Sequence, residues 1–190
     1  MEALKLQTVD DLEKASQHDD RIELVNGEII KRPMACPEHA LAQSDLAGQF
    51  FPLSRQPVDK GWWIMTEISV EYSEHHCPIH DLAGWRKERL PQRPKRKMHI
   101  IPDWVCEITS PGHERKDAIV QLMRLQTFRV PHYWVLSPED RTLIAYALDG
   151  EHYRVVQSVE CHEATECDQL IIPPFEEMVV DLGHIFGFID

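Results

Sequence analysis

Two apolar segments, residues 79–85 and 104–109, constrain the fold of this chain more than any other feature, and each carries one acid, Asp81 or Glu107. Both segments are rich in residues that favour β-strands. The second is too apolar to form an exposed edge strand. We therefore expect two strands that each carry one acid, and strands that deliver two carboxylates to one place are a common way for a protein to hold a divalent metal ion.

Glu107 is the more informative of the two acids. The alternation of a strand places it on the same side as Val105 and opposite Trp104. A carboxylate in such a strand is costly to bury unless it is paired, hydrogen-bonded or bound to a metal. From residue types alone, two interpretations stay open: a functional carboxylate, or a salt bridge with Arg115 or Lys116.

The remaining pattern predicts an α/β fold, a sandwich of helices around a mixed β-sheet. Hydrophobic periodicity, capping residues and turn residues define the other elements. Helices are expected at residues 8–16, 37–53 and 114–129, a hairpin at 21–31 with Asn26-Gly27 as its turn, strands at 62–72, 133–136, 142–148 and 153–159, and an edge strand with a final turn in the tail.

Length and composition exclude several classes of protein. A chain of 190 residues is normally one domain, here residues 1–190, and a hydrophobic content of 43% excludes a disordered chain. No run approaches the ~20 apolar residues of a membrane span. The polar N-terminus does not read as an export signal, so we expect a cytoplasmic protein with five reduced thiols: Cys36, Cys77, Cys106, Cys161 and Cys167.

The charge of the chain is uneven. The formal net charge of -12 argues against a protein that coats nucleic acid non-specifically, because phosphate affinity comes from lysine and arginine. One short stretch is nevertheless strongly basic, which suits local contact with phosphate groups; the alternative is a solvated loop. Its members are Arg86, Lys87, Arg89, Arg93, Lys95, Arg96 and Lys97.

Several longer segments carry a resemblance to a known family. They are Gly61-Trp62-Trp63, Asp81-Leu82-Ala83-Gly84-Trp85-Arg86, Pro102-Asp103-Trp104-Val105-Cys106-Glu107 and Val130-Pro131-His132-Tyr133-Trp134. Together they resemble a bacterial family of putative restriction endonucleases, formerly a domain of unknown function, within the PD-(D/E)XK nuclease superfamily. The match runs in order from about residue 22 to the C-terminus.

The resemblance implies a restriction-endonuclease-like fold, a mixed β-sheet flanked by helices, and a nuclease that hydrolyses DNA phosphodiester bonds. Asp81 and Glu107 would be catalytic residues that hold Mg²⁺ or Mn²⁺, while Glu67 and His39 would support the site. DNA would be the partner, contacted by the basic stretch, and a homodimer would carry two sites for two strands. For His39, a hydrogen-bonded residue on the helix surface is the competing interpretation.

The lysine of the family's pattern is missing. The resemblance places it on the helix after Glu107, four residues beyond Asp117, where this chain has Gln121. Glutamine donates a hydrogen bond but carries no charge. Lys116 and Arg124, on the same helix, are the candidates to supply the missing positive charge. The chain also has Ile79-His80-Asp81 where the family usually has Val-Pro-Asp.

Two other classes of protein remain open. The first is a catalytically inactive nuclease-fold module that binds DNA or a protein partner. The second is a scaffold stabilised by zinc, because histidine and cysteine are good zinc ligands, although their spacing here matches no standard arrangement. The residues in question are His75, His76, Cys77, His80, Cys161, His162 and Cys167.

Overall fold

A six-stranded mixed sheet forms the centre of the computed structural model, which describes residues 5–19, 21–110 and 114–188, with the backbone alone for 114–118. The strands follow the chain in order, and only β5 and β6 run parallel. This confirms the prediction of a mixed sheet. The strands are β3 (Trp62–Ser69), β4 (Ile79–Arg86), β5 (Trp104–Ile108), β6 (His132–Ser137), β7 (Thr142–Asp149) and β8 (His152–Glu160).

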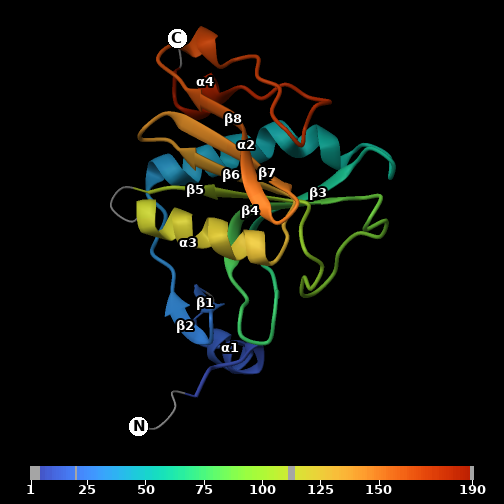
Figure 1. The fold of residues 1–190 in the computed structure, drawn as a ribbon, viewed down its shortest axis with the longest axis vertical. Helices are drawn as coiled ribbons and strands as arrows, with labels where there is room; N and C mark the ends of the chain where they lie inside the picture. The colour runs from blue at the N-terminus through green and yellow to red at the C-terminus, as the bar shows by residue number, and fades with distance from the viewer. Residues whose placement is uncertain (1–4, 20, 111–113, 189–190) are drawn as a thin grey trace.

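Two long helices cover opposite faces of the sheet (Figure 1), α2 (Pro37–Ser54) on one and α3 (Glu114–Thr127) on the other. α3 also connects the parallel strands β5 and β6, which need such a crossover. None of the helices in the described ranges is long and apolar enough to cross a membrane.

A smaller unit precedes the sheet and lies at the N-terminal end of the molecule in Figure 1. It contains α1 (Val9–Ser16), β1 (Ile22–Val25) and β2 (Glu28–Lys31). Asn26 and Gly27 both have positive φ angles, 52° and 81°, as the predicted two-residue turn requires. Leu24 and Cys77 exchange backbone hydrogen bonds, so the hairpin is attached to the loop between β3 and β4.

The larger core lies between the sheet and α2. Its centre is a set of five aromatic rings whose contacting centroids are 4.4–6.0 Å apart: Phe50, Trp62, Trp104, Trp134 and Phe175. Trp104, Cys106 and Ile108 belong to this core, whereas Val105 packs in the cluster on the α3 side. The predicted alternation along β5 is therefore confirmed.

Helical periodicity predicts that Leu41 shares one face with Leu46, and it marks Ile119 and Met123 as apolar positions of the helix at 114–129, but the structure differs in these details. Leu41 is 63% exposed, because the buried stripe of α2 passes through Ala42 and Leu46 instead. On α3, Ile119 and Met123 are exposed, and Leu125 supplies the buried contact. In both cases the helix buries a single narrow stripe, and a shift of one position moves a side chain out of it.

The tail also differs from the prediction. Instead of an edge strand, it forms an isolated bridge between Leu170 and Val180, followed by α4 (Leu182–Ile185). Its side chains Ile172 and Phe175 are fully buried, so it closes the core on the α2 side.

The prediction of five reduced thiols is wrong for one pair. Cys161 and Cys167 form a disulfide, and their Cα atoms lie 6.2 Å apart, inside the roughly 4.4–6.8 Å that such a bond needs. The short 3-10 helix η1 (Ala164–Glu166) turns the chain back between them. Cys36, Cys77 and Cys106 are free thiols.

Gly84 on β4 gives a test of the side-chain packing on the α2 face of the sheet. A Cβ atom there would lie 2.7 Å from Ile64 Cδ1 and 3.2 Å from ring carbons of Trp62 and Trp104. We expect Gly84→Ala to lower the free energy of unfolding by about 1–3 kcal/mol, measured by urea denaturation. The control is Gly48→Ala on α2, where nothing lies within 4 Å. Equal stability of the two variants would contradict this packing.

Candidate functional site

The site begins at an irregularity near the start of β4. Glu67 on β3 and Asp81 on β4 lie opposite each other, but the pairing of the two strands skips them, and Glu67 has a φ of 47°. Such a conformation is strained for a residue with a side chain, and strain of this kind is common at functional sites. On the other side of Asp81, its carboxylate Oδ2 accepts the backbone N–H of Ile108 at 2.7 Å. At this point, side-chain contacts therefore replace the backbone hydrogen bonds between the strands.

Asp81 is the centre of these contacts and is only 2% exposed. Arg32 Nη2 donates to its Oδ1 at 2.7 Å, and His39 Nε2 lies 3.4 Å from the same oxygen. Gln43 Nε2 donates to the backbone carbonyl of Asp81 at 2.8 Å. Burial alone would raise the pKa of Asp81, but the contact with His39, the charge of Arg32 and the N–H of Ile108 together hold that pKa below its usual value.

Glu67 and His39 complete a possible metal centre around Asp81. One ligand atom from each of the three residues lies within 4.8 Å of the other two. Two carboxylates and an imidazole are a donor set that suits a divalent cation. Glu67 is half exposed, so the group is open to solvent on that side, whereas His39 and Asp81 are buried. The residues present therefore fit a metal ion.

Glu107 has a different environment. Its Oε1 lies 2.6 Å from His80 Nδ1, and His80 Nε2 lies 2.9 Å from the hydroxyl of Tyr72. Burial holds the pKa of His80 at about 4, so its ring is neutral, and a proton on Nδ1 lets it donate to Glu107 while Nε2 accepts from Tyr72. Burial, and then the negative charge of Asp81, raise the pKa of Glu107 well above its usual value.

The two strand acids therefore interact, but they differ. The pKa of Asp81 is lowered and that of Glu107 is raised. Asp81 is the carboxylate held in its charged form, and Glu107 is the one that takes up a proton more readily. Opposite shifts in neighbouring carboxyl groups are typical of sites that do chemistry.

Comparison with known proteins agrees with this architecture. The model of the Uma2 family, described as a putative restriction endonuclease, matches residues 6–177 of the chain. The chain belongs to the Uma2 family. The fold is shared with a solved structure described as a putative nuclease belonging to DUF820 from Anabaena variabilis ATCC 29413. That match has a TM-score of 0.73 and 19% identity, over 95% of this chain and 98% of that chain. No curated protein matches. The predicted family and restriction-endonuclease-like fold are confirmed.

Gln121, at the position of the missing lysine, is half-buried on α3 of this Uma2 chain. It lies one helical turn before Leu125, which is buried in the same cluster as Val105. Because residues four apart share one face of a helix, Gln121 lies on the side of α3 that faces the sheet. The side chain of Lys116 falls outside the described residues. The charge of Arg124 acts on His76, whose pKa burial and this charge lower to about 4.

The basic stretch divides into two groups. Four of its members have contacts within the chain: Arg86 stacks on Trp62, Lys87 lies over Trp63 and donates to two backbone carbonyls, Arg89 pairs with Asp103, and Lys97 pairs with Glu13. Arg93, Lys95 and Arg96 are exposed. Arg93, Lys95 and Lys97 help to line an open hollow of about 600 Å³. This surface is where the predicted contact with phosphate groups is best tested.

The histidine and cysteine residues considered as zinc ligands have separate partners. His75 Nδ1 contacts the carbonyl of Gln7, His76 Nδ1 accepts the N–H of Asn26, and Cys77 pairs with Ser69. His80 contacts Glu107, and Cys161 is bonded to Cys167. Within the described ranges, the ligand atoms that gather closely enough for an ion are those of His39, Glu67 and Asp81.

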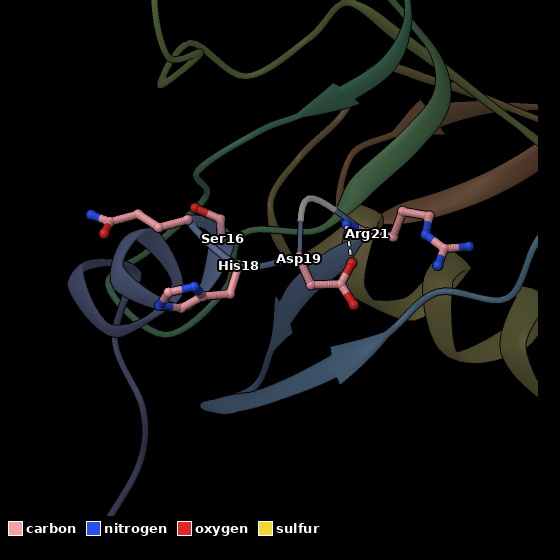
Figure 2. A pocket seen from close by; sticks show the side chains of 5 residues that line it. Ser16, His18, Asp19 and Arg21 are labelled. Atoms are coloured by element: carbon pink, nitrogen blue, oxygen red, sulfur yellow. Dashed lines mark hydrogen bonds between the residues drawn. The ribbon is translucent and has the colours of Figure 1, made fainter.

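A second hollow, of about 440 Å³, lies at the end of α1 (Figure 2). Its acid, Asp19, accepts the backbone N–H of Arg21 at 3.0 Å and pairs with Lys31 at 2.6 Å. Since this carboxylate is already neutralised by a neighbour and the hollow is open, we assign no chemistry to it.

Sequence reasoning missed two residues of the site, Arg32 and Gln43. Gln43 had a detectable signal, because it lies four residues after His39 on α2 and therefore on the same face. Arg32 had none, because it follows the N-terminal hairpin, and only the docking of that hairpin brings it to Asp81.

Proposed function

We propose that this Uma2 chain is a metal-dependent endonuclease of the PD-(D/E)XK type that hydrolyses DNA phosphodiester bonds. Mg²⁺ or Mn²⁺ is the proposed ion. The observation that carries the proposal is the arrangement around Asp81: two acids on neighbouring strands that interact, with His39 and Glu67 close enough to share an ion with Asp81. Membership of a restriction endonuclease family supports the same reaction.

Each residue has a proposed role. Asp81 and Glu107 would hold the ion and Glu67 and His39 would support it, with Glu107 joining the ion from outside the group formed by His39, Glu67 and Asp81. The bound ion would supply a water of lowered pKa and neutralise charge on the scissile phosphate. His80 and Tyr72 fix the orientation of Glu107, since a carboxylate that ligates a metal works best when its second oxygen and its neighbours are held by hydrogen bonds.

Gln121 makes this a weakened catalyst in our proposal. A lysine at its position would place a positive charge beside the phosphate as negative charge develops in the transition state. Glutamine offers only a neutral donor.

DNA is the proposed partner. The exposed side chains of Arg93, Lys95 and Arg96 would contact the phosphate backbone of the DNA. A cytoplasmic homodimer with one site in each subunit would cut both strands.

A second candidate function is a catalytically inactive nuclease-fold module that binds DNA or a protein partner. Two observations favour it: Gln121 lacks the charge, and Arg32 already neutralises Asp81 and Glu67. The two candidates differ in whether an ion binds at Asp81.

Thermal unfolding with added metal tests the proposal. We expect Mn²⁺ or Mg²⁺ to raise the melting temperature, because a ligand that binds only the folded state stabilises it. At an ion concentration of 100 times Kd the gain is roughly 2.7 kcal/mol. Asp81→Ala should remove the shift. An equal shift in Asp81→Ala would show that the ion binds elsewhere, and no shift in the wild type would favour the inactive module.

A further inference from the structure

Arg32 occupies the carboxylates that the proposed ion needs. Its Nη1 lies 2.7 Å from Glu67 Oε2 and its Nη2 lies 2.7 Å from Asp81 Oδ1. The guanidinium therefore bridges two acids that come from adjacent strands. Both acids belong to the group that has its ligand atoms within 4.8 Å of one another, and Arg32 reaches that group from outside it.

The ion pairs of Arg32 with Asp81 and Glu67 are strong. An arginine stays charged at any physiological pH, and its planar fork suits paired carboxylate oxygens. Burial would lower the pKa of Arg32, but the charges of Asp81 and Glu67 outweigh it and raise that pKa. A divalent ion on the same oxygens would face a full positive charge a few ångströms away, and like charges at that distance repel by several kcal/mol.

We propose that Arg32 is the resident cation of the metal site, bridging Asp81 and Glu67 until a divalent ion displaces its guanidinium. The proposal rests on the proposed function, because it takes the ion to bind at Asp81. It makes Arg32 a positioning residue that sets the affinity of the site: the arginine keeps the two acids together and neutralised without metal, and it weakens the binding of metal.

The surroundings allow the exchange. Arg32 lies just after β2 in a segment without regular structure, and its side chain is 20% exposed. Glu67 is 56% exposed, so an ion reaches it from solvent. Gln43 Nε2 donates to Glu67 Oε1 and to the carbonyl of Asp81, so both residues keep a support when the guanidinium leaves.

The experiment is isothermal titration calorimetry, in which Mn²⁺ alone is added to the metal-free protein and the dissociation constant is measured. We expect Arg32→Met to bind Mn²⁺ at least about 10-fold more tightly than the wild type, because the competing charge is gone. Arg32→Lys keeps a charge without the fork and should fall between the two. The matched control is Arg154→Met, which removes one charge from an exposed arginine on β8 that pairs with Asp149.

The variants separate the possible results. The Arg32→Met gain must vanish in the double variant with Asp81→Asn, and Arg154→Met must bind as the wild type does. Wild-type binding with no tightening in Arg32→Met or Arg32→Lys would overturn the role of Arg32 and leave the proposed function standing. Failure of every variant and of the wild type to bind Mn²⁺ would overturn both. If Arg32→Met does not fold without metal, the Arg32→Lys comparison decides.

Discussion

Replacing Gln121 by lysine is expected to raise the rate of Mg²⁺-dependent DNA cleavage about 100-fold. The reason is electrostatic: a cation placed where charge develops on the phosphate stabilises the transition state more than the ground state. Gln121 is half-buried on the face of α3 that also carries Leu125, on the Val105 side of β5. The measurement is the initial rate of cleavage of a linear DNA duplex at fixed Mg²⁺ concentration.

Two further variants make this result specific. Gln121→Ala should cleave about as slowly as the wild type, because neither side chain is charged. Gln169→Lys adds the same charge at an exposed position of the tail and should leave the rate unchanged. Efficient cleavage by the wild type with no gain from Gln121→Lys would show that another side chain supplies the charge.

Removing the charge of Glu107 should have a comparably large effect in the opposite direction. Glu107→Gln keeps the size of the side chain and an oxygen that accepts from His80, but it loses the negative charge that would hold the ion. We expect cleavage to fall by at least about 100-fold, since a bound ion contributes several kcal/mol to such reactions. The rate is measured in the Gln121→Lys background, where activity is highest.

Glu160→Gln, at an exposed position on β8, is the control for a lost negative charge. Circular dichroism melting of both variants separates a lost fold from a lost site. Unchanged cleavage by folded Glu107→Gln would remove Glu107 from the site and leave Asp81 with His39 and Glu67.

Much of the fold could be predicted because it depends on local pattern. The alternation of Trp104, Val105 and Glu107 fixed the two faces of β5, and Asn26-Gly27 fixed the turn of the hairpin. Errors arose where tertiary packing decides between near-equal options. By periodicity alone, Leu41 lies on the apolar face of its helix, but Ala42 and Leu46 are the residues buried in the core beside the sheet.

The site was predictable in part and for a different reason. Asp81 and Glu107 stand out because each is an acid inside an apolar strand, and the family resemblance added His39 and Glu67. The spacing of residues carried no information on Arg32, which lies 49 positions from Asp81 in the chain. The contact between Glu107 and His80 could not be predicted either. In the sequence, His80 is close to Cys77 and resembles a zinc ligand, whereas in the structure its ring lies between Tyr72 and Glu107.

The most direct measurement is a crystal structure of the protein soaked in Mn²⁺, with an anomalous difference map calculated at the manganese absorption edge. We predict a peak at Asp81, with carboxylate oxygens of Asp81 and Glu107 at coordination distances of about 2.1 Å and the Arg32 guanidinium moved away from Asp81. A fully occupied manganese site elsewhere, with Arg32 still bridging Asp81 and Glu67, would contradict the assignment of this site as the metal centre of a nuclease.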